Sequence, residues 1–314
     1  MTRPITRSDI YFYRDLVSVS RNAVIVFRPG SAQRRLAWLD RRGTVLKTVG
    51  PVGAIMNVSL SADNREAAFT QKQVETDLLR VWTLDLDRDV VAPLADAAWM
   101  PVFTPDGRSI LYRNDGSTSE MRRRSLRDHK EESLLAYTFV SPSDVSADGR
   151  FVLFTRARNL GDIGVLALAG DRKPEILLDS EHDEREPGFS PDGRWMAYSS
   201  SEPGQFEIFV RRFPLTDEKW QVSSGGGLQP IWGHDGRELF YINLDRQLMV
   251  VPLSTGTTFT AGTPRVLFQT AVRLNNISHQ YAVSADQQRI LMVVPVQDIE
   301  SEVFRVLLDW RPAP

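Results

Sequence analysis

Ser190-Pro-Asp-Gly-Arg194 is followed at once by the apolar stretch Trp195-Met-Ala-Tyr198, and this unit recurs along the chain. The other copies are Thr104-Pro-Asp-Gly-Arg108, Ser146-Ala-Asp-Gly-Arg150 and Gly233-His-Asp-Gly-Arg237, the weaker Ser61-Ala-Asp-Asn-Arg65 and Ser284-Ala-Asp-Gln-Gln288, and the fainter Ser20-Arg-Asn22. Self-similarity at a nearly fixed period is the sequence signature of a repeat architecture.

The spacing and composition of the repeats decide which architecture this is. The motif aspartates lie 43, 42, 44, 43 and 51 residues apart in chain order, and Asn22 precedes the first of them by 41 residues. This period suits a four-stranded propeller blade or a two-helix solenoid repeat. Helical repeats need long amphipathic stretches, whereas these segments are short, rich in Val, Ile, Phe, Tyr and Trp, and bounded by Gly, Pro, Asp and Asn. The sequence therefore predicts an all-β fold, a single β-propeller of four-stranded antiparallel blades.

Four strands can be placed within one repeat, and the ends of the chain suggest how the ring closes. The fifth copy supplies Pro187–Ser190, Trp195–Ser200, Phe206–Phe213 and Trp220–Ser223. The last repeat supplies His279–Val283, Arg289–Val294 and Val303–Trp310, and Ile10–Tyr13 has the composition of the missing outer strand. An N-terminal strand that completes the last blade removes free sheet edges. Seven copies predict seven blades in one domain over residues 1–314, with six as the alternative if Asn22 marks no blade. The longest step contains Ser254–Gly262, which we interpret as an enlarged hairpin loop.

The repeated aspartate has a structural explanation in every copy. In Pro-Asp-Gly, proline presets its φ, the aspartate side chain caps nearby amides and glycine adopts the left-handed conformation. The motif aspartates are therefore interpreted as turn formers that join the inner strand of a blade to the second. They are Asp63, Asp106, Asp148, Asp192, Asp235 and Asp286. The apolar residue before each motif is expected to point between blades. These residues are Phe103, Val145, Phe189, Trp232 and Val283.

The net charge, the cysteine count and the length of the apolar runs exclude several classes of function. Net charge is −2, with 38 basic and 40 acidic residues, so no global field favours nucleic acid or an anionic membrane. The absence of cysteine excludes disulfides, thiolate zinc sites and a cysteine nucleophile, but it does not choose a compartment. The longest apolar run, Ile290–Val296, is far shorter than the roughly 20 residues of a membrane helix, so any membrane tether would lie outside this segment.

The Ser-Pro-Asp-Gly-Arg strings resemble TolB-type, WD-repeat-like propeller repeats. More narrowly, Phe206–Pro214, Lys219–Gly227 and Gln229–Tyr241 are similar to the propeller that follows the kinase domain and membrane span of many bacterial receptor-type serine/threonine kinases. The resemblance covers nearly the whole chain and is strongest over Ser141–Phe268. It implies a sensor or interaction module, on the outer side of a membrane, and it carries over no catalytic residue. The chain itself lacks the glycine-rich, His-Arg-Asp and Asp-Phe-Gly signatures of a kinase.

Enzymatic propellers are the alternative class. The sialidase Asp box and the Gly-x-Ser-x-Gly elbow of prolyl-oligopeptidase-type enzymes are both absent. Metal-dependent lactonase propellers gather Glu, Asn and Asp at the channel, for which Asn57, Asp144 and Glu186 are candidates. The four histidines, at positions 129, 182, 234 and 279, have no metal-ligand spacing. The basic stretch Met121–Arg127 is interpreted as a solvated edge, with a docking patch for an acidic partner as the alternative.

A ligand is expected at one mouth of the central channel, in the loops that enter the inner strands. The repeats align on a position four residues before each motif serine or threonine, occupied by Leu16, Asn57, Met100, Pro142, Glu186, Gln229 and Gln280, with Trp99, Arg185 and His279 just upstream. The predicted binding residues are Asn57, Trp99, Arg185, Glu186, Gln229, His279 and Gln280, with Asp183–Glu186 as the best single patch. This set suits a peptide or a small polar ligand, but it assembles no acid, base and nucleophile.

The sequence therefore predicts a monomeric, non-catalytic binding propeller that needs no metal or cofactor and acts as a sensor or scaffold within a larger signalling protein. Two alternatives remain: a lactonase-like, metal-assisted hydrolase, and a periplasmic TolB-like protein that docks peptides.

Overall fold

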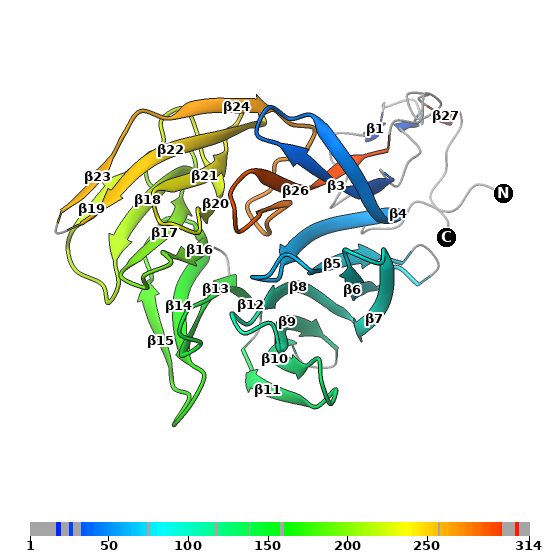
Figure 1. The fold of residues 1–314 in the computed structure, drawn as a ribbon, viewed down its shortest axis with the longest axis horizontal. Helices are drawn as coiled ribbons and strands as arrows, with labels where there is room; N and C mark the ends of the chain where they lie inside the picture. The colour runs from blue at the N-terminus through cyan, green and yellow to red at the C-terminus, as the bar shows by residue number, and fades with distance from the viewer. Residues whose placement is uncertain are drawn as a thin grey trace. The chain divides into compact units, whose positions relative to one another are not determined.

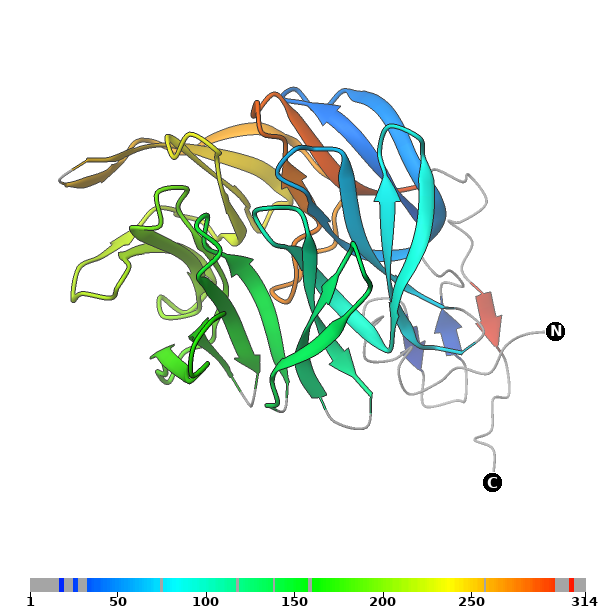
Figure 2. The ribbon, with the colours of Figure 1, turned by 60° about the horizontal axis from the view of Figure 1, so that its bottom comes forward.

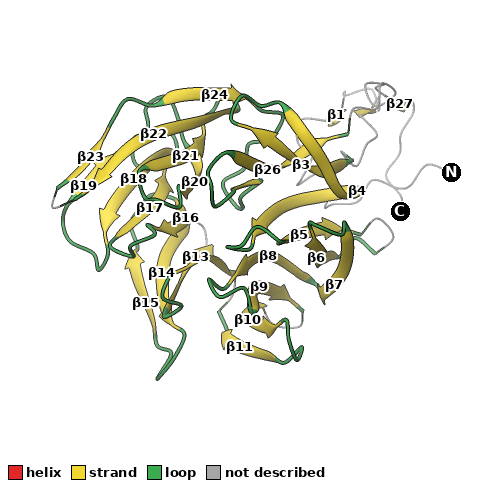
Figure 3. Ribbon diagram, in the orientation of Figure 1, coloured by secondary structure: helices red, strands yellow, loops and turns green. Residues whose placement is uncertain are grey.

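The computed structural model describes residues 17–19, 25–27 and 305–307, and residues 33–296 apart from 74–75, 117–118, 138, 158–159 and 257. The chain divides into two compact units, Arg34–Pro295 and the combined segments Met1–Gln33 and Val296–Pro314. Strands and loops make up all of the described part (Figure 3), which contains no helix that could cross a membrane. The all-β class predicted from the repeat is confirmed.

Six antiparallel sheets make up the unit Arg34–Pro295. The first sheet has β4 (Val45–Leu60), β5 (Glu66–Lys72), β6 (Leu79–Asp85) and β7 (Val90–Asp96). The second has β8 (Ala98–Phe103), β9 (Ser109–Asp115), β10 (Ser119–Ser125) and β11 (Glu131–Leu135). The third has β12 (Val140–Val145), β13 (Phe151–Ala157), β14 (Gly161–Ala167) and β15 (Pro174–Leu178).

The other three sheets repeat this pattern and add two variations. The fourth has β16 (Glu184–Phe189), β17 (Trp195–Ser200), β18 (Glu207–Arg212) and β19 (Lys219–Gln221). The fifth has β20 (Leu228–Trp232), β21 (Glu238–Ile242), β22 (Gln247–Thr255), β23 (Phe259–Ala261) and β24 (Arg265–Gln269). The sixth has β25 (Tyr281–Val283), β26 (Arg289–Pro295), β3 (Arg34–Asp40) and the first part of β4, whose second part belongs to the first sheet.

These six sheets close into a ring. A separate hydrophobic cluster lies at each of the six junctions between successive sheets, including the junction of the sixth sheet with the first. The residues before the motif, such as Phe103, Phe189 and Trp232, are buried in these clusters. Figure 1 shows the ring face-on, and β8, β12, β16 and β20 lie nearest its centre. The core of a propeller is thus divided among the sheet faces, and the inner strands are left to line a central space.

N-terminal strands complete the last blade, as expected, but the strands differ from those predicted. All of β26, Arg289 to Pro295, pairs with β3. The edge expected to receive Val303–Trp310 is therefore already occupied, and that prediction is wrong. Within that segment the described strand β27 (Arg305–Leu307) pairs instead with β2 (Ile25–Phe27), which also pairs with β1 (Val17–Val19).

With the sheet that contains β4 divided in two at that strand, the described residues form seven sheets, six in the ring and the three-stranded sheet β1-β2-β27. The fainter copy of the motif at Ser20–Asn22, the strand proposed at Ile10–Tyr13 and the ring position Leu16 lie outside the described residues. The assignment of one domain to residues 1–314 stays a prediction.

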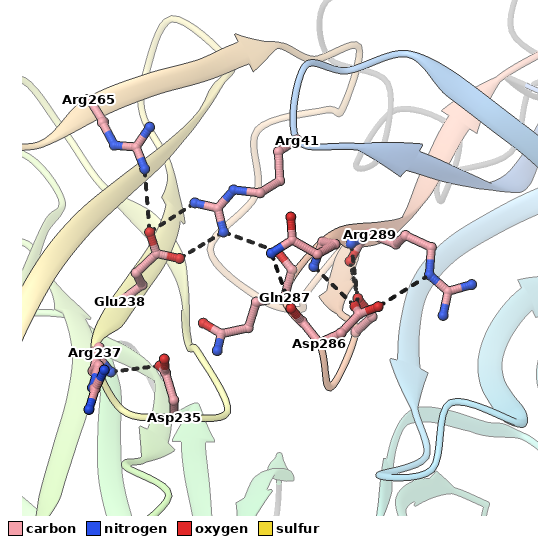
Figure 4. A network of polar contacts seen from close by, with 10 residues as sticks. Arg41, Asp235, Arg237, Glu238, Arg265, Asp286, Gln287 and Arg289 are labelled. Carbon is pink, nitrogen blue, oxygen red and sulfur yellow. Dashed lines mark hydrogen bonds and ion pairs between the residues drawn. The ribbon is translucent and has the colours of Figure 1, made fainter.

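An ion-pair cluster joins the closing hairpin to the fifth sheet. Arg41, in the turn between β3 and β4, donates to both carboxylate oxygens of Glu238 on β21, at 2.8 and 2.9 Å. Its guanidinium also donates to the carbonyl oxygen of Gln287, in the β25–β26 turn, at 3.0 Å. Arg265 lies 3.4 Å from the same carboxylate (Figure 4). One arginine therefore connects the N-terminal hairpin, the fifth sheet and the last turn of the ring.

The long step between motifs is an extended hairpin. Strand β22 runs on to Thr255 and returns as β23, with Leu253 opposite Ala261 and Thr255 opposite Phe259. Figure 2 shows this yellow to orange hairpin projecting away from the ring. The enlargement predicted for Ser254–Gly262 is therefore present, and it is built from strand rather than from open loop.

The motif turns share one hydrogen-bond pattern, seen in the copy at Ser190. The Ser190 hydroxyl donates to the Asp192 carboxylate at 2.6 Å and accepts the Trp195 amide at 3.0 Å. Asp192 also accepts the Arg194 amide, and Gly193 has a φ of +68°. At every other copy in the described range a backbone N–H likewise donates to the motif carboxylate, and the acceptors are Asp63, Asp106, Asp148, Asp235 and Asp286. The motif aspartates are thus engaged in the backbone of the turns.

Candidate central binding cavity

The six inner strands enclose a cavity of about 360 Å³ at the centre of the ring. Each strand contributes the residue two positions before its motif. These residues are Ser59, Val102, Asp144, Gly188, Ile231 and Ala282. Side chains alternate along a strand, so this position faces the cavity while the next residue, which precedes the motif, packs between sheets.

A bulge in the inner strands shapes the wall of the cavity. The pairing with the second strand shifts between Trp99 and Val102, between Arg185 and Gly188, and between Leu228 and Ile231. The first bulged residue has a positive φ in each case: +56° at Met100, +56° at Glu186 and +59° at Gln229. A β-bulge breaks the ladder at one residue and turns its side chain away from the regular alternation.

A proline follows each of these three bulged residues. Pro101, Pro187 and Pro230 all line the cavity. Because proline has no backbone N–H, these positions leave no unpaired amide donor facing the central space. The Met-Pro, Glu-Pro and Gln-Pro pairs in the sequence are therefore explained by the geometry of the wall.

The bulged side chains also bind neighbouring sheets together. Glu186 accepts the backbone N–H of Gln229 at 2.8 Å, and the Gln229 side chain accepts the backbone N–H of Gln280 at 2.8 Å. The Tyr281 hydroxyl donates to the Gln229 carbonyl at 2.8 Å. These bonds run from the fourth sheet to the fifth and from the fifth to the sixth, so the predicted binding residues Gln229 and Gln280 have a structural role between sheets.

Asp144 is a half-buried carboxyl group in the cavity wall. Its oxygens accept the N–H of Phe189, in the next sheet, at 2.7 Å and the N–H of Val145 at 2.9 Å. Burial raises the pKa of Asp144 to about 7, although both hydrogen bonds act in the opposite direction. The group therefore changes charge near neutral pH.

Glu186 is a second carboxyl group of the wall and is only 3% exposed. Burial raises its pKa to about 8, against the smaller opposing effect of the Gln229 N–H and the Ser199 hydroxyl. Its Oε2 accepts both of those bonds, whereas its Oε1 has no hydrogen-bond partner. A buried polar atom without a partner is uncommon in native structures.

Asn57 and His279 add polar groups with different properties. The Asn57 Oδ1 accepts the Thr70 N–H at 3.1 Å, while its buried Nδ2 has no hydrogen-bond partner. The His279 Nε2 lies 3.2 Å from the Pro230 carbonyl oxygen, and burial lowers the pKa of His279 to about 4. The imidazole is therefore neutral at physiological pH and contributes no positive charge to the cavity.

The wall contains two carboxyl groups and no lysine or arginine among its described residues. The nearest arginine in sequence, Arg185, is bound to Asp183 at 2.6 Å. No group of three His, Asp or Glu side chains within the described ranges is arranged to hold a metal ion. The chemistry of the cavity is thus that of two carboxyl groups in a proline-rich, largely apolar wall.

The predicted binding residues separate into two groups. Asn57, Glu186 and His279 line the cavity, whereas Trp99, Arg185, Gln229 and Gln280 do not. The Trp99 ring lies under the Arg113 guanidinium, 4.9 Å from the ring centre. Within Asp183–Glu186, Asp183 accepts the Gly161 N–H at 2.7 Å. Most of that patch is therefore engaged in local contacts, and Glu186 alone reaches the cavity.

The basic stretch Met121–Arg127 is largely paired within its own sheet. Arg122 contacts Glu120 and Glu131, and Arg123 contacts Glu132. These pairs neutralise much of the positive charge that would recruit an acidic partner, which favours the interpretation of a solvated edge.

Asp144 and Gly188 line the cavity, but the alignment of the repeats did not select them as binding residues. That alignment used the position four residues before the motif, where the bulged Glu186 and Gln229 side chains bond to backbone amides of the next sheet. The available signal was the period-2 alternation of a strand, which places the residue two before the motif on the face opposite the buried Val145 or Phe189.

Comparison with solved structures gives the same architecture. A TolB-type protein from Agrobacterium tumefaciens matches with a TM-score of 0.67 and 15% identity, over 85% of this chain and 99% of that one. TolB from Acinetobacter baumannii matches with a TM-score of 0.56 and 16% identity, over 77% and 68%. The Cps50 (Swd1) β-propeller domain of Myceliophteria thermophila gives 0.52 and 11%, over 78% and 88%.

No family model matches the chain, and no curated protein matches it in sequence. At the identities found, the likeness to solved structures shows the fold. The chain is a β-propeller, and its predicted resemblance to TolB-type propellers is confirmed at that level. None of the three structures bears on the kinase-associated propellers.

Proposed function

We propose that this chain is a non-catalytic binding propeller whose ligand, a peptide segment, enters the central cavity. The supporting observation is the cavity wall, which combines the polar residues Asn57, Asp144 and His279 with apolar and proline side chains. Its volume of about 360 Å³ falls in the range of roughly 300–1,000 Å³ typical of ligand sites. Binding of a ligand in this cavity requires no chemical step.

A catalytic role has weaker support from the same residues. Asp144 is bonded to backbone amides and Glu186 to a backbone amide and the Ser199 hydroxyl, and His279 contacts a carbonyl oxygen rather than a hydroxyl group. A nucleophile activated by a base needs those two side chains within hydrogen-bond reach of each other. The Ser199 hydroxyl is within reach of Glu186, but Ser199 is fully buried and lies outside the cavity wall, so binding is the simpler function.

A second part of the proposal concerns the larger protein to which the propeller belongs. The stretches Phe206–Pro214, Lys219–Gly227 and Gln229–Tyr241 resemble the propellers of bacterial receptor-type kinases, and on that basis we place the module in a signalling protein as a sensor or scaffold. Binding in the cavity and membership of such a protein are separate claims, and only the first depends on the wall residues.

Gly188 offers a way to block the cavity without straining the fold. A Cβ added there would lie 3.7 Å from Asp144 Oδ2 as its nearest neighbour, which is ordinary van der Waals contact, and its φ is not left-handed. Gly188→Leu therefore fills the cavity from its own wall. Gly256→Leu is the matched control, because an added Cβ at that exposed position meets nothing within 4 Å.

The experiment exposes the immobilised protein to a phage-displayed library of random decapeptides. Peptides enriched on the wild type and on Gly256→Leu, but not on Gly188→Leu, are the expected result. Equal enrichment on all three proteins would place binding outside the cavity, and no enrichment over bare support would overturn peptide binding altogether. Matching circular dichroism spectra and unfolding midpoints of the three proteins verify that the blocked variant is folded.

A further inference from the structure

The cavity has an electrostatic character that goes beyond an ability to bind peptides. Its described wall includes the carboxyl groups of Asp144 and Glu186, the imidazoles of His234 and His279, and no lysine or arginine. His234 is exposed, whereas His279 is neutral because burial lowers its pKa to about 4. The ion pair of Arg185 with Asp183 and the phenol of Tyr281, whose pKa burial raises further above its ordinary value, also lie close to the two carboxyl groups. No lysine or arginine of the described wall therefore balances the carboxylates.

Each carboxyl group keeps acceptor capacity that the protein does not use. Glu186 Oε1 has no partner, and each oxygen of Asp144 accepts a single backbone N–H. An ionised carboxylate offers about four acceptor sites, so both groups can accept further N–H donors. Asp144 is half-buried and presents this capacity to the cavity, whereas the Glu186 Oε1 atom is buried beside it.

The rest of the wall suits an alkyl chain. Pro101, Pro187, Pro230, Val102 and Ile231 present apolar surface around the two carboxyl groups. Lysine and arginine side chains combine an apolar stem with a cationic head that donates several hydrogen bonds. A neutral polar side chain would leave the carboxylates uncompensated, and an acidic one would be repelled by them.

We infer that the cavity recognises a lysine or arginine side chain of the bound peptide, with Asp144 and Glu186 as the counter-charges for its cationic head. The inference rests on the proposed peptide-binding function and names the chemistry that this function selects. The apolar stem of that side chain lies along the proline-lined wall, its cationic head donates hydrogen bonds to the Asp144 carboxylate, and the Glu186 carboxylate adds negative charge beside it.

The state of the two carboxyl groups makes the interaction dependent on pH. Without a bound cation, the carboxyl groups of Asp144 and Glu186 are largely protonated below pH 7. Burial raises the pKa of Asp144 to about 7 and that of Glu186 to about 8. A cation binds the ionised form, so its apparent affinity scales with the ionised fraction. Between pH 6 and pH 8 the affinity should rise about tenfold through Asp144 alone, while His279 stays neutral throughout.

The test uses the peptides selected in the library experiment. Those whose enrichment is lost on Gly188→Leu are sequenced, and the most enriched one is synthesised with its lysine or arginine intact and with glutamine or citrulline in that place. Titration calorimetry against the wild type is expected to give at least tenfold weaker binding for the neutral peptide. Agmatine, a free guanidinium compound, should compete with the cationic peptide.

The protein variants test the named carboxyl groups. Asp144→Asn and Glu186→Gln keep an acceptor oxygen for the Phe189 and Gln229 amides but lose the charge, so both should fold and bind the cationic peptide at least tenfold more weakly. They should also flatten its pH profile. Asp148→Asn, in an exposed turn, is the charge-matched control and should bind like the wild type.

The outcomes separate this inference from the proposed function. The cation preference would be overturned if the peptides whose enrichment is lost on Gly188→Leu contained no lysine or arginine. Equal affinity of the citrulline and arginine peptides would overturn it as well, and either result would leave peptide binding intact. If no peptide lost its enrichment on Gly188→Leu, the proposed function of peptide binding in the cavity would itself be overturned. Full binding of the cationic peptide by both carboxamide variants would also contradict the roles given to Asp144 and Glu186.

Discussion

Aspartate has two opposite roles in this chain, and its position relative to the motif decides which. Asp148, in the turn, is held ionised by the Ser146 hydroxyl and the Arg150 amide, which lower its pKa to about 2. Asp144, four residues earlier, faces the central cavity, where burial raises its pKa to about 7. The same side chain therefore stabilises a turn in one place and forms a titratable site in the other.

This difference predicts opposite effects of pH on stability. An unfolded aspartate titrates near pH 3.8, so between about pH 4 and pH 7 the folded wild type holds a proton on Asp144 that the unfolded chain has released. Folding then binds a proton, and stability falls as pH rises through this window. Urea unfolding of wild type and Asp144→Asn at pH 5 and pH 8 should show the variant gaining relative to the wild type at the higher pH.

Asp148→Asn serves as the control with the opposite sign. The folded pKa of Asp148 is about 2, below the unfolded 3.8, so its contribution is present above pH 4 and lost as pH falls toward 2. This variant should differ from the wild type by the same amount at pH 5 and pH 8. A constant difference for Asp144→Asn as well would contradict the raised pKa.

At the scale of the element, strand glycines are distinguished by the room around them. A Cβ at Gly164 on β14 would lie 2.2 Å from Phe154 Cζ and 2.9 Å from the Glu175 carbonyl oxygen, so Gly164→Ala forces the neighbouring side chain and strand apart. Such overpacking typically costs about 1–3 kcal/mol. Gly188→Ala meets no close neighbour and should leave the free energy of unfolding unchanged or raise it by a few tenths of a kcal/mol.

Urea unfolding of the two alanine variants, measured side by side, checks this prediction. A loss at Gly188 as large as that at Gly164 would mean that the cavity wall is tightly packed, and it would remove the basis for the Gly188→Leu block.

Much of each element could be predicted from the sequence. The stretch predicted as Phe206–Phe213 is β18, Glu207–Arg212, and the stretch predicted as Trp220–Ser223 overlaps β19, Lys219–Gln221. These strands are visible because alternation and turn residues are local signals. The bulge at Glu186 was not visible, because a shift of register depends on pairing with β17, a non-local contact.

The cavity residues were predicted in part for the same reason. Asn57, Glu186 and His279 were found because polar residues at an aligned position suggested a shared site. Asp144 entered only as a candidate metal ligand, because its place in the wall depends on which side of the bulge it occupies. The charge state of the cavity could not be predicted, since it comes from burial by six different strands.

At the scale of the whole molecule, ring closure is a long-range event. Arg41 and Glu238 are almost 200 residues apart in sequence and form a two-pronged ion pair with side chains that are 20% and 22% exposed. Partial burial and paired geometry make such a contact stronger than a typical surface pair. The choice of β3 as the strand that completes the last blade could not be read from local pattern.

A double-mutant cycle on this pair tests its contribution to closure. Arg41→Ala, Glu238→Ala and the double variant should give a coupling free energy of about 1 kcal/mol in urea unfolding. The exposed pair Arg88 and Asp85, whose charged atoms are 3.8 Å apart, is the control and should give a coupling near zero. Equal coupling free energies would mean that the pair of Arg41 and Glu238 stabilises the fold no more than an exposed ion pair does.

The central claim is that the ligand enters the cavity, and methionine methyl groups can locate it directly. Met100 lines the cavity, whereas the buried Met121 and Met249 lie in clusters between sheets. In protein carrying ¹³C-methyl methionine, titration with the selected cationic peptide should shift the Met100 resonance and leave those of Met121 and Met249 in place. An unmoved Met100 signal at saturating peptide would contradict the account.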